Sequence, residues 1–404
     1  MTDESSAAWW QRKDLVIENN ELVFAARRVG ELAAQFDSPA FFYHAHRVTD
    51  KLKGLHAALD NAGFAGRFKI HYAMKANRFA PLLTHLKGAG LCGIDACSPA
   101  EVEHAISCGF EPADISFTAT SLSQKDLLQL SRYKDVFINC DSLHTIRHIG
   151  ELCPGRDIGI RVNPEVGIGY GENEKLRYSG AASTKFGIYR EQFHDALALA
   201  KKYKLNIKKI HFHTGCGYLN QQLDSWSDVI EQCLWFIDQL ESVTSVNVGG
   251  GLGVPHTQTD IALDLSKWAQ VLAKHFLHRS IRIEVEPGDY LVKDAGILLL
   301  TVNSIEQKKS TTFVGVDAGF NLAVEPAVYG LPFLPVPVKV NSGAEQVVTL
   351  VGNINEALDV WYHNISLPPL NENDHIVLIN AGAYSSSMAS NHCMRGSFKE
   401  FLLL

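Results

Sequence analysis

Short apolar runs rich in β-branched residues recur between residues 40 and 288, and amphipathic stretches of helical length separate them. This alternation is typical of repeated strand–helix units. If the first run is a lead-in, eight strands remain, and the pattern predicts an eight-stranded (β/α) barrel, the TIM-barrel architecture. The runs occupy residues 41–45, 69–76, 92–98, 115–119, 136–142, 158–164, 209–215, 246–251 and 281–288.

Two of the intervening stretches carry clear helical signals. Residues 99–108 follow Ser98, which suits an N-cap, and residues 223–239 carry apolar side chains at helical spacing. An open, doubly wound sheet would also alternate strands and helices. The ends of the runs favour the barrel, because all its strand C-termini converge on one mouth. Those ends carry Lys75, Asp95, Asp141, Arg161, His213, Gly249–Gly251 and Glu286.

The pattern changes after residue 290, where strand-like runs follow one another without long helices between them. These runs occupy residues 296–307, 312–319, 335–340, 345–354 and 375–385. These runs predict a separate β domain over residues 289–404. Residues 15–26 resemble a hairpin that turns at Asn19–Asn20, so we expect residues 1–38 to join this β domain. The barrel then occupies residues 39–288.

Composition narrows the choice of partners and compartment. The 404 residues carry a formal charge of −7 without a basic run, so we expect no nucleic-acid partner. We expect no signal peptide and no membrane span, and therefore a cytoplasmic protein. The eight cysteines form no CxxC pair and no zinc-spaced cluster, which predicts reduced thiols and no metal site.

Several residues at the predicted mouth are suited to cofactor chemistry, and each has a plainer alternative. Partial desolvation would favour a neutral amine at Lys75, able to attack an aldehyde, although a surface lysine is the alternative. Three consecutive glycines at 249–251 suit a phosphate cradle or a tight turn. Glu286 suits a protonated ring nitrogen or an ion pair. His213 suits stacking on an aromatic cofactor or a place in the core.

The motifs together resemble the fold-type III pyridoxal-phosphate decarboxylases, the family of diaminopimelate, ornithine and biosynthetic arginine decarboxylases. The resemblance covers nearly the whole chain in the family's order and spacing. It implies an alanine-racemase-like barrel with a β domain, pyridoxal 5′-phosphate as cofactor, and decarboxylation of a small amino acid. It rests on YAMKAN (72–77), INCDSL (138–143), RVNP (161–164), STKFGI (183–188), HFHTGCG (211–217), GGGLGVP (249–255), EPG (286–288), FVGVDAGFN (313–321), PAVYG (326–330) and AGAYSSSMASN (381–391).

The resemblance also implies a role for each site residue. Lys75 resembles the Schiff-base lysine, His213 the residue stacked on the ring, and Glu286 the partner of the ring nitrogen. Family members are typically homodimers with shared active sites, so the segment 353–359 is expected to reach in from the partner chain. The implied phosphate ligands are Gly249, Gly250, Gly251, Cys216 and Tyr384, and the residues implied behind the ring are Asp95 and Arg161.

Four positions depart from the family pattern. Asp289 and Glu325 stand where diaminopimelate decarboxylases have arginines that help to hold the distal carboxylate or the phosphate, which disfavours an anionic substrate tail. Asn355 replaces the usual Cys that is thought to protonate Cα, and Asn is no acid. Either Glu356, Lys75 or water then supplies the proton, or the stereochemistry of the step differs from the family norm. Cys216 replaces a Ser, with the loss of one hydroxyl from the phosphate site.

We therefore expect a substrate with a cationic or extended distal end, such as a diamino acid, a carboxylated polyamine or a specialised amino acid of the siderophore type. Arg395 would accommodate an acid-bearing substrate if it faces the pocket. The expected catalytic residues are Lys75, Glu356 and His213, and the expected substrate contacts are Asp289, Glu325, Tyr329, Asn355, Glu356 and Asp359.

Three other functions remain open from the sequence. Diaminopimelate decarboxylation itself is one. An amino-acid racemase shares the architecture and the lysine, but racemases place Arg at the ring nitrogen, where this chain has Glu286. A non-catalytic regulatory homologue would be expected to lose cofactor ligands, and here the full set is present.

Overall fold

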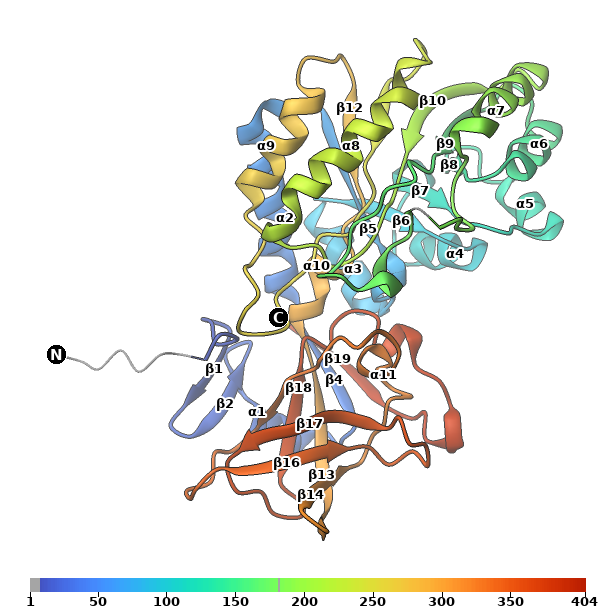
Figure 1. The fold of residues 1–404 in the computed structure, drawn as a ribbon. Coiled ribbons are helices and arrows are strands. Elements are labelled where there is room, and N and C mark those ends of the chain that lie inside the picture. The colour runs from blue at the N-terminus through green and yellow to red at the C-terminus, as the bar shows by residue number, and fades with distance from the viewer. Residues whose placement is uncertain (1–7, 181) are drawn as a thin grey trace. The chain divides into compact units, whose positions relative to one another are not determined.

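The computed structural model describes residues 8–180 and 182–404. The chain forms two compact units, each built around its own strands (Figure 1). The barrel unit comprises residues 49–254 and 261–290, and the sheet unit comprises the residues up to 48 together with 255–260 and 291–404.

In the described part of the barrel unit, eight parallel strands form a closed barrel, which confirms the predicted (β/α) architecture. Each strand pairs with the next along the chain, and the last strand closes the barrel by pairing with the first. The strands are β5 (Phe68–Ala73), β6 (Gly93–Ala96), β7 (Ile115–Thr118), β8 (Phe137–Cys140), β9 (Asp157–Arg161), β10 (Asn206–His211), β11 (Ser245–Asn247) and β12 (Arg282–Val285).

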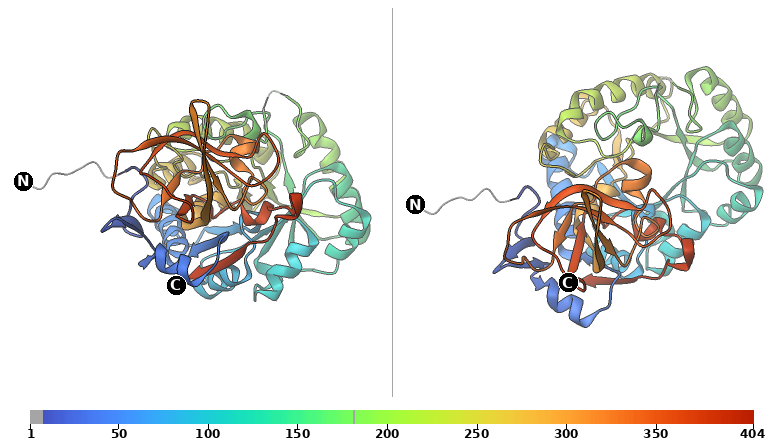
Figure 2. Two further views of the ribbon diagram at one scale, coloured as in Figure 1. Left: turned by 90° about the horizontal axis from the view of Figure 1, so that it is seen from below. Right: turned by 60° about the horizontal axis from the view of Figure 1, so that its bottom comes forward.

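Helices alternate with these strands and form the outer layer (Figure 2, right). The Ser98 hydroxyl accepts the Glu101 N–H at the start of α4, as a helix N-cap does. Helix α8 buries one apolar face, which includes Trp226 and Phe236. Both helices confirm the sequence-based prediction. The helices are α2 (Ala45–Leu59), α3 (Ala80–Ala89), α4 (Pro99–Ser107), α5 (Gln124–Leu130), α6 (Leu143–Leu152), α7 (Arg190–Lys202), α8 (Leu223–Asp238), α9 (Leu265–Phe276) and α10 (Asp289–Val292).

The sheet unit centres on β13 (Gly296–Lys308), the long strand whose first half is buried between β4 and β18. Its second half turns into a hairpin with β14 and extends to the more exposed strands β16 and β17. The other elements are α1 (Val29–Gln35), β4 (Ala40–His44), β14 (Thr311–Val316), α11 (Glu325–Tyr329), β15 (Pro335–Pro337), β16 (Gln346–Val351), β17 (Val360–Leu367), β18 (His375–Ile379) and β19 (Lys399–Leu403).

The N-terminal hairpin joins β1 (Leu15–Glu18) to β2 (Glu21–Phe24), and β3 (Arg27–Arg28) extends it. Asn19 and Asn20 have φ values of 52° and 61°, the left-handed conformation that a two-residue hairpin turn requires. The predicted turn is therefore confirmed. The apolar side chains of the hairpin belong to one hydrophobic cluster with those of β4, β13 and β18.

Three strands differ from the sequence-based prediction. The run 41–45, counted there within the barrel segment, forms β4, which pairs with β13 and β19 in the sheet unit. Its residues are apolar on both faces, as in a barrel strand, so periodicity alone assigns it to neither fold. The prediction also omitted β17 and β19. In the part of the chain that the structure describes, every helix is too short or too polar to cross a bilayer.

Candidate active site

Residues from six barrel strands meet at the carboxyl end of the barrel, because parallel strands in a closed barrel share one rim there. The structure thereby brings together the predicted site residues of the barrel unit. Lys75 lies in a short 3-10 turn directly after β5, Asp95 on β6, Arg161 at the end of β9, His213 after β10, Gly249–Gly251 after β11 and Glu286 after β12.

Lys75 is half-buried and lies next to the end of β6. Ala73 pairs with Asp95, so the chain beyond them places Lys75 alongside Cys97. Cys97 and Asp95 raise the pKa of Lys75, and burial opposes them only in part. The direction of this shift favours the protonated amine in the protein alone, whereas the sequence predicts a neutral one.

Glu286 is buried and receives two side-chain hydrogen bonds. His211 Nε2 lies 3.0 Å from Oε2, and Asn247 Nδ2 donates to Oε1 at 2.6 Å. Burial alone would raise the pKa of Glu286, but His211 and its hydrogen bond lower it to about 2. Glu286 is therefore ionised at neutral pH, as a partner for a protonated ring nitrogen must be.

Asp95 behaves in the opposite way. Burial, followed by the charge of Glu286, raises the pKa of Asp95 well above its ordinary value, and Lys75 offsets this only in part. Its Oδ1 is buried and accepts no hydrogen bond from the described residues. Near it, the guanidinium of Arg161 lies 4.7 Å from the centre of the Phe186 ring, in cation–π contact.

The glycine run is required by close backbone contacts. A Cβ at Gly250 would lie 2.2 Å from the Glu286 carbonyl oxygen, and one at Gly251 would lie 2.3 Å from the Gly215 carbonyl oxygen. Gly249 and Gly251 also have φ values of 71° and 96°. Larger residues therefore do not fit in this run.

His213 lies beside this glycine run. Its Nδ1 accepts the Gly250 N–H at 3.3 Å, its ring centre is 4.9 Å from that of Tyr178, and its Nε2 is 3.7 Å from Cys216 Sγ. Burial and the cation of Lys75 hold the pKa of His213 well below its ordinary value. The ring is therefore neutral, which suits stacking on another aromatic ring.

Comparison with known families decides which cofactor this mouth is built for. The pyridoxal-binding domain of the pyridoxal-dependent decarboxylases matches residues 46–293, and their C-terminal sheet domain matches residues 289–382. The chain belongs to the pyridoxal-dependent decarboxylase family. It is a carboxy-lyase that uses pyridoxal phosphate to remove a carboxylate from an amino acid.

The similar proteins match this chain over nearly its whole length. A diaminopimelate decarboxylase of Methanothermobacter thermautotrophicus is 31% identical over 96% of this chain and 92% of its own. That of Escherichia coli K12 is 30% identical, over 93% and 91%. The structure of Helicobacter pylori diaminopimelate decarboxylase complexed with L-lysine is 26% identical and superimposes with a TM-score of 0.82 over 93% of this chain and 94% of its own.

The residues of the decarboxylase mouth fit pyridoxal phosphate. A Cβ in the glycine run would collide with the surrounding backbone, Glu286 is ionised, and the buried Asp95 Oδ1 lacks a partner among the described residues. A phosphate, a ring nitrogen and a polar ring substituent suit these three features in turn.

Glu325 requires a correction. Both of its carboxylate oxygens lie within hydrogen-bond distance of Lys293 Nζ, at 2.7 and 2.6 Å, and both side chains are buried. Glu325 is therefore half of a neutral ion pair, not a free acid of the pocket. Asp289, at the start of α10 in the barrel unit, is 7% exposed.

Asp359 also differs from its predicted role as a substrate contact. Its carboxylate accepts the backbone N–H groups of Phe320 at 2.7 Å and Ile354 at 2.6 Å, so it fastens its own loop. On this loop Asn355 and Glu356 are exposed, and Glu356 Oε1 lies 3.2 Å from His392 Nε2.

The remaining predicted residues of the sheet unit have these positions. Tyr329 ends α11 and Tyr384 follows β18 with a φ of 51°, and both are half-buried. Arg395 is exposed.

Sequence reasoning missed His211, Asn247 and Lys293. His211 ends β10 and His213 follows it two residues later, and this spacing was the one available signal. The other two gave none, because their partners are distant in the sequence.

Proposed function

We propose that this enzyme decarboxylates an amino acid with a cationic or extended distal end, such as a diamino acid, a carboxylated polyamine or a specialised amino acid of the siderophore type. The observation that carries the proposal is the buried Lys293–Glu325 pair at a position where diaminopimelate decarboxylases have arginine. Asp289 occupies the second such position.

The chemistry of a distal carboxylate explains why this matters. A guanidinium binds a carboxylate through two parallel hydrogen bonds. An aspartate at position 289 supplies no cation, and the ammonium of Lys293 already binds both oxygens of Glu325. Neither of the two arginine positions therefore supplies a cation to an anionic tail, whereas an amine or a long neutral chain needs none.

A carbon dioxide release assay tests this proposal. We expect turnover of meso-diaminopimelate at least about 10-fold below that of the best diamino acid or carboxylated polyamine, because losing a charged contact costs this much or more. The triple variant Asp289→Arg, Glu325→Arg, Lys293→Ala should raise meso-diaminopimelate turnover. The Escherichia coli relative serves as the positive control. Turnover of meso-diaminopimelate by the native enzyme that equals the best alternative contradicts the proposal.

We also propose roles for the barrel residues. Lys75 holds the cofactor covalently, Glu286 keeps the ring nitrogen protonated, His213 covers one ring face, and the glycines hold the phosphate. The bound cofactor supplies an electron sink for the bond to the departing carboxylate. Borohydride reduction should leave a cofactor mass on the Lys75 peptide, and Lys75→Ala should lose both this mass and the visible absorbance. A tag on another lysine contradicts the assignment.

For the proton returned to Cα, we propose Glu356, since Asn355 cannot supply one. Its carboxylate is held by His392 on an exposed loop. Glu356→Gln should lower kcat by about 100-fold or more with the cofactor absorbance unchanged, in the range for a lost general acid. A normal kcat would assign the step to Lys75 or water.

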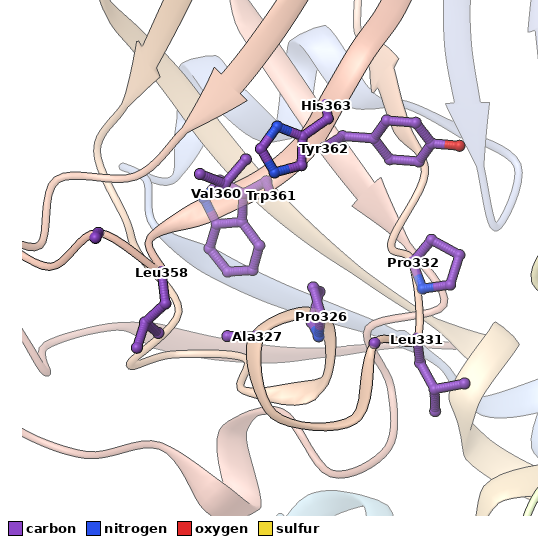
Figure 3. A pocket seen from close by; sticks show the side chains of 11 residues that line it. Pro326, Ala327, Leu331, Pro332, Leu358, Val360, Trp361, Tyr362 and His363 are labelled. Atoms are coloured by element: carbon purple, nitrogen blue, oxygen red, sulfur yellow. The ribbon is translucent and has the colours of Figure 1, made fainter. Parts of the chain in front are cut away.

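We propose a homodimer in which the loop 353–359 contacts the partner subunit. An apolar groove of about 410 Å³ lies beside this loop, and Leu358 is 49% exposed at its edge (Figure 3). The other lining residues are Pro326, Ala327, Gly330, Leu331, Pro332, Ala357, Val360, Trp361, Tyr362 and His363. A second copy of the chain would cover this apolar surface. The loop 353–359 extends the same surface through Leu358.

Light scattering tests the dimer. Leu358→Asp should give a monomer with little activity, because a buried unpaired charge opposes association. Leu128→Asp is the matched control, since Leu128 is 50% exposed on α5, far along the chain from this loop. A dimeric Leu358→Asp variant argues against this interface.

The eight free cysteines support a reducing compartment. We therefore propose that the enzyme acts in the cytoplasm, which cell fractionation can check.

A further inference from the structure

Asn247 is fixed in one orientation between the glycine run and Glu286. Its Oδ1 accepts the Gly249 N–H at 2.9 Å, so its amide nitrogen must point to Glu286, where it donates at 2.6 Å. The Glu286 N–H in turn donates to the Gly249 carbonyl at 2.8 Å. These three bonds join β11 to the end of β12, and Asn247 is fully buried.

His211 supplies the second hydrogen bond through Nε2. A carboxylate only accepts, so the His211 Nε2 that lies 3.0 Å from Glu286 Oε2 carries the proton. His211 Nδ1 is buried and has no hydrogen-bond partner among the described residues, and burial lowers the pKa of His211. Each oxygen of the Glu286 carboxylate therefore faces a fixed side-chain donor, His211 for Oε2 and Asn247 for Oε1.

The second carboxyl of the mouth, Asp95, lacks comparable donors. No side chain in the described structure donates to its Oδ1, although Asp95 is as buried as Glu286. Two buried carboxyls that interact cannot both ionise easily, and hydrogen bonds decide which one does. His211 at the end of β10 and Asn247 at the end of β11 both point to Glu286.

We infer that His211 and Asn247 are positioning residues that place the negative charge of the mouth on Glu286 and not on Asp95. This inference rests on the proposed role of Glu286 at the ring nitrogen and adds the reason why that role is possible. Neither residue touches the reacting bond. Both act by keeping the Glu286 carboxylate ionised and oriented. This carboxylate in turn determines whether the ring nitrogen is protonated.

The test follows the ring nitrogen directly, with enzyme that is loaded with pyridoxal phosphate labelled with ¹⁵N in the ring. The native enzyme should show a protonated nitrogen throughout its stable pH range. His211→Phe and Asn247→Leu should lose this proton within that range and lower kcat by about 10- to 100-fold, with little change in KM, as expected for a lost charge-assisted hydrogen bond. His211→Gln, which keeps a donor, should recover most of the loss.

Matched controls separate this role from a structural one. Asn139→Leu removes another fully buried asparagine of the barrel, which donates to Ser116 and Thr118, and His275→Phe removes a histidine that contacts Ser227 between outer helices. Both controls should leave the ring nitrogen protonated, even where they lower stability. Asp95→Asn should also leave it protonated, because the charge already lies on Glu286.

Three results overturn the inference, and they are distinguishable from one another. If Glu286→Gln loses the ring proton while His211→Phe and Asn247→Leu keep it, the two residues do not position the charge, although the proposed role of Glu286 stands. If the native ring nitrogen is unprotonated, both the inference and that proposed role fail. Loss of the ring proton in Asp95→Asn would place the charge on Asp95 instead.

Discussion

Glu284 repeats the arrangement of Glu286 two residues earlier on β12. Its Oε2 lies 2.5 Å from Lys209 Nζ and 3.3 Å from His71 Nε2, and Lys209 lies 3.9 Å from the centre of the Phe137 ring. Strand residues two apart share a face, so the barrel interior carries two ionic layers, one above the other. Burial would raise the pKa of Glu284, but Lys209 keeps it well below its ordinary value.

Loss of Lys209 should therefore destabilise the whole protein. Lys209→Met leaves Glu284 buried without its cation, which typically costs about 3–5 kcal/mol. Denaturant unfolding of the cofactor-free protein measures the change, and the double variant with Glu284→Gln should recover part of it. Lys399→Met breaks the exposed pair with Asp37 and is the control, with no measurable change expected. An unchanged denaturation midpoint for Lys209→Met would contradict the stabilising role of Lys209 beside Glu284.

Glu286 predicts a dependence of stability on pH. Its pKa is about 2 in the folded protein, below its ordinary value of 4.5. A carboxyl with a depressed folded-state pKa contributes full stability above 4.5 and loses that contribution as the pH falls toward 2. Glu286→Gln should remove this part of the acid sensitivity. The measurement is the free energy of unfolding as a function of pH, and identical curves for the two proteins would show that Glu286 is not so stabilised.

At the scale of elements, alternation of apolar and helical runs sufficed to predict all eight barrel strands, because each is a continuous buried run between helices. Strand β17 escaped detection since three of its eight residues are exposed and polar. The hydrogen bonds to Glu286 were also out of reach, because they depend on β10, β11 and β12 meeting around one point. The motif resemblance identified the glycine run. It did not reveal the backbone contacts that require glycine at these positions.

Gly250→Ala tests those contacts. The added methyl would lie 2.2 Å from the Glu286 carbonyl oxygen, so the loop after β11 or the end of β12 must move. We expect a weaker dissociation constant for pyridoxal phosphate and a lower melting temperature. Gly88→Ala is the control, since a Cβ there meets no atom within 4 Å, and alanine favours the helix α3. Equal cofactor affinity for Gly250→Ala and native enzyme would show that the cradle tolerates the displacement.

At the scale of the whole molecule, the proposed homodimer builds each active site from two subunits. One subunit supplies the barrel unit, and its partner supplies the loop 353–359. Lys75→Ala removes the cofactor lysine, and Asp359→Ala releases the loop that Asp359 fastens through Phe320 and Ile354. Each variant alone should be inactive. A mixed dimer, however, places both lesions in one site and leaves the other site intact.

Co-expression of the two inactive variants should therefore restore about a quarter of the native activity, because random pairing makes half of the dimers mixed and each has one intact site. Active-site titration of the purified mixture measures the restored fraction, and separately purified variants that are combined without exchange provide the control. A site completed within one chain predicts no recovery in any mixture. The same experiment therefore decides between a shared site and two independent ones without reference to the substrate that the enzyme prefers.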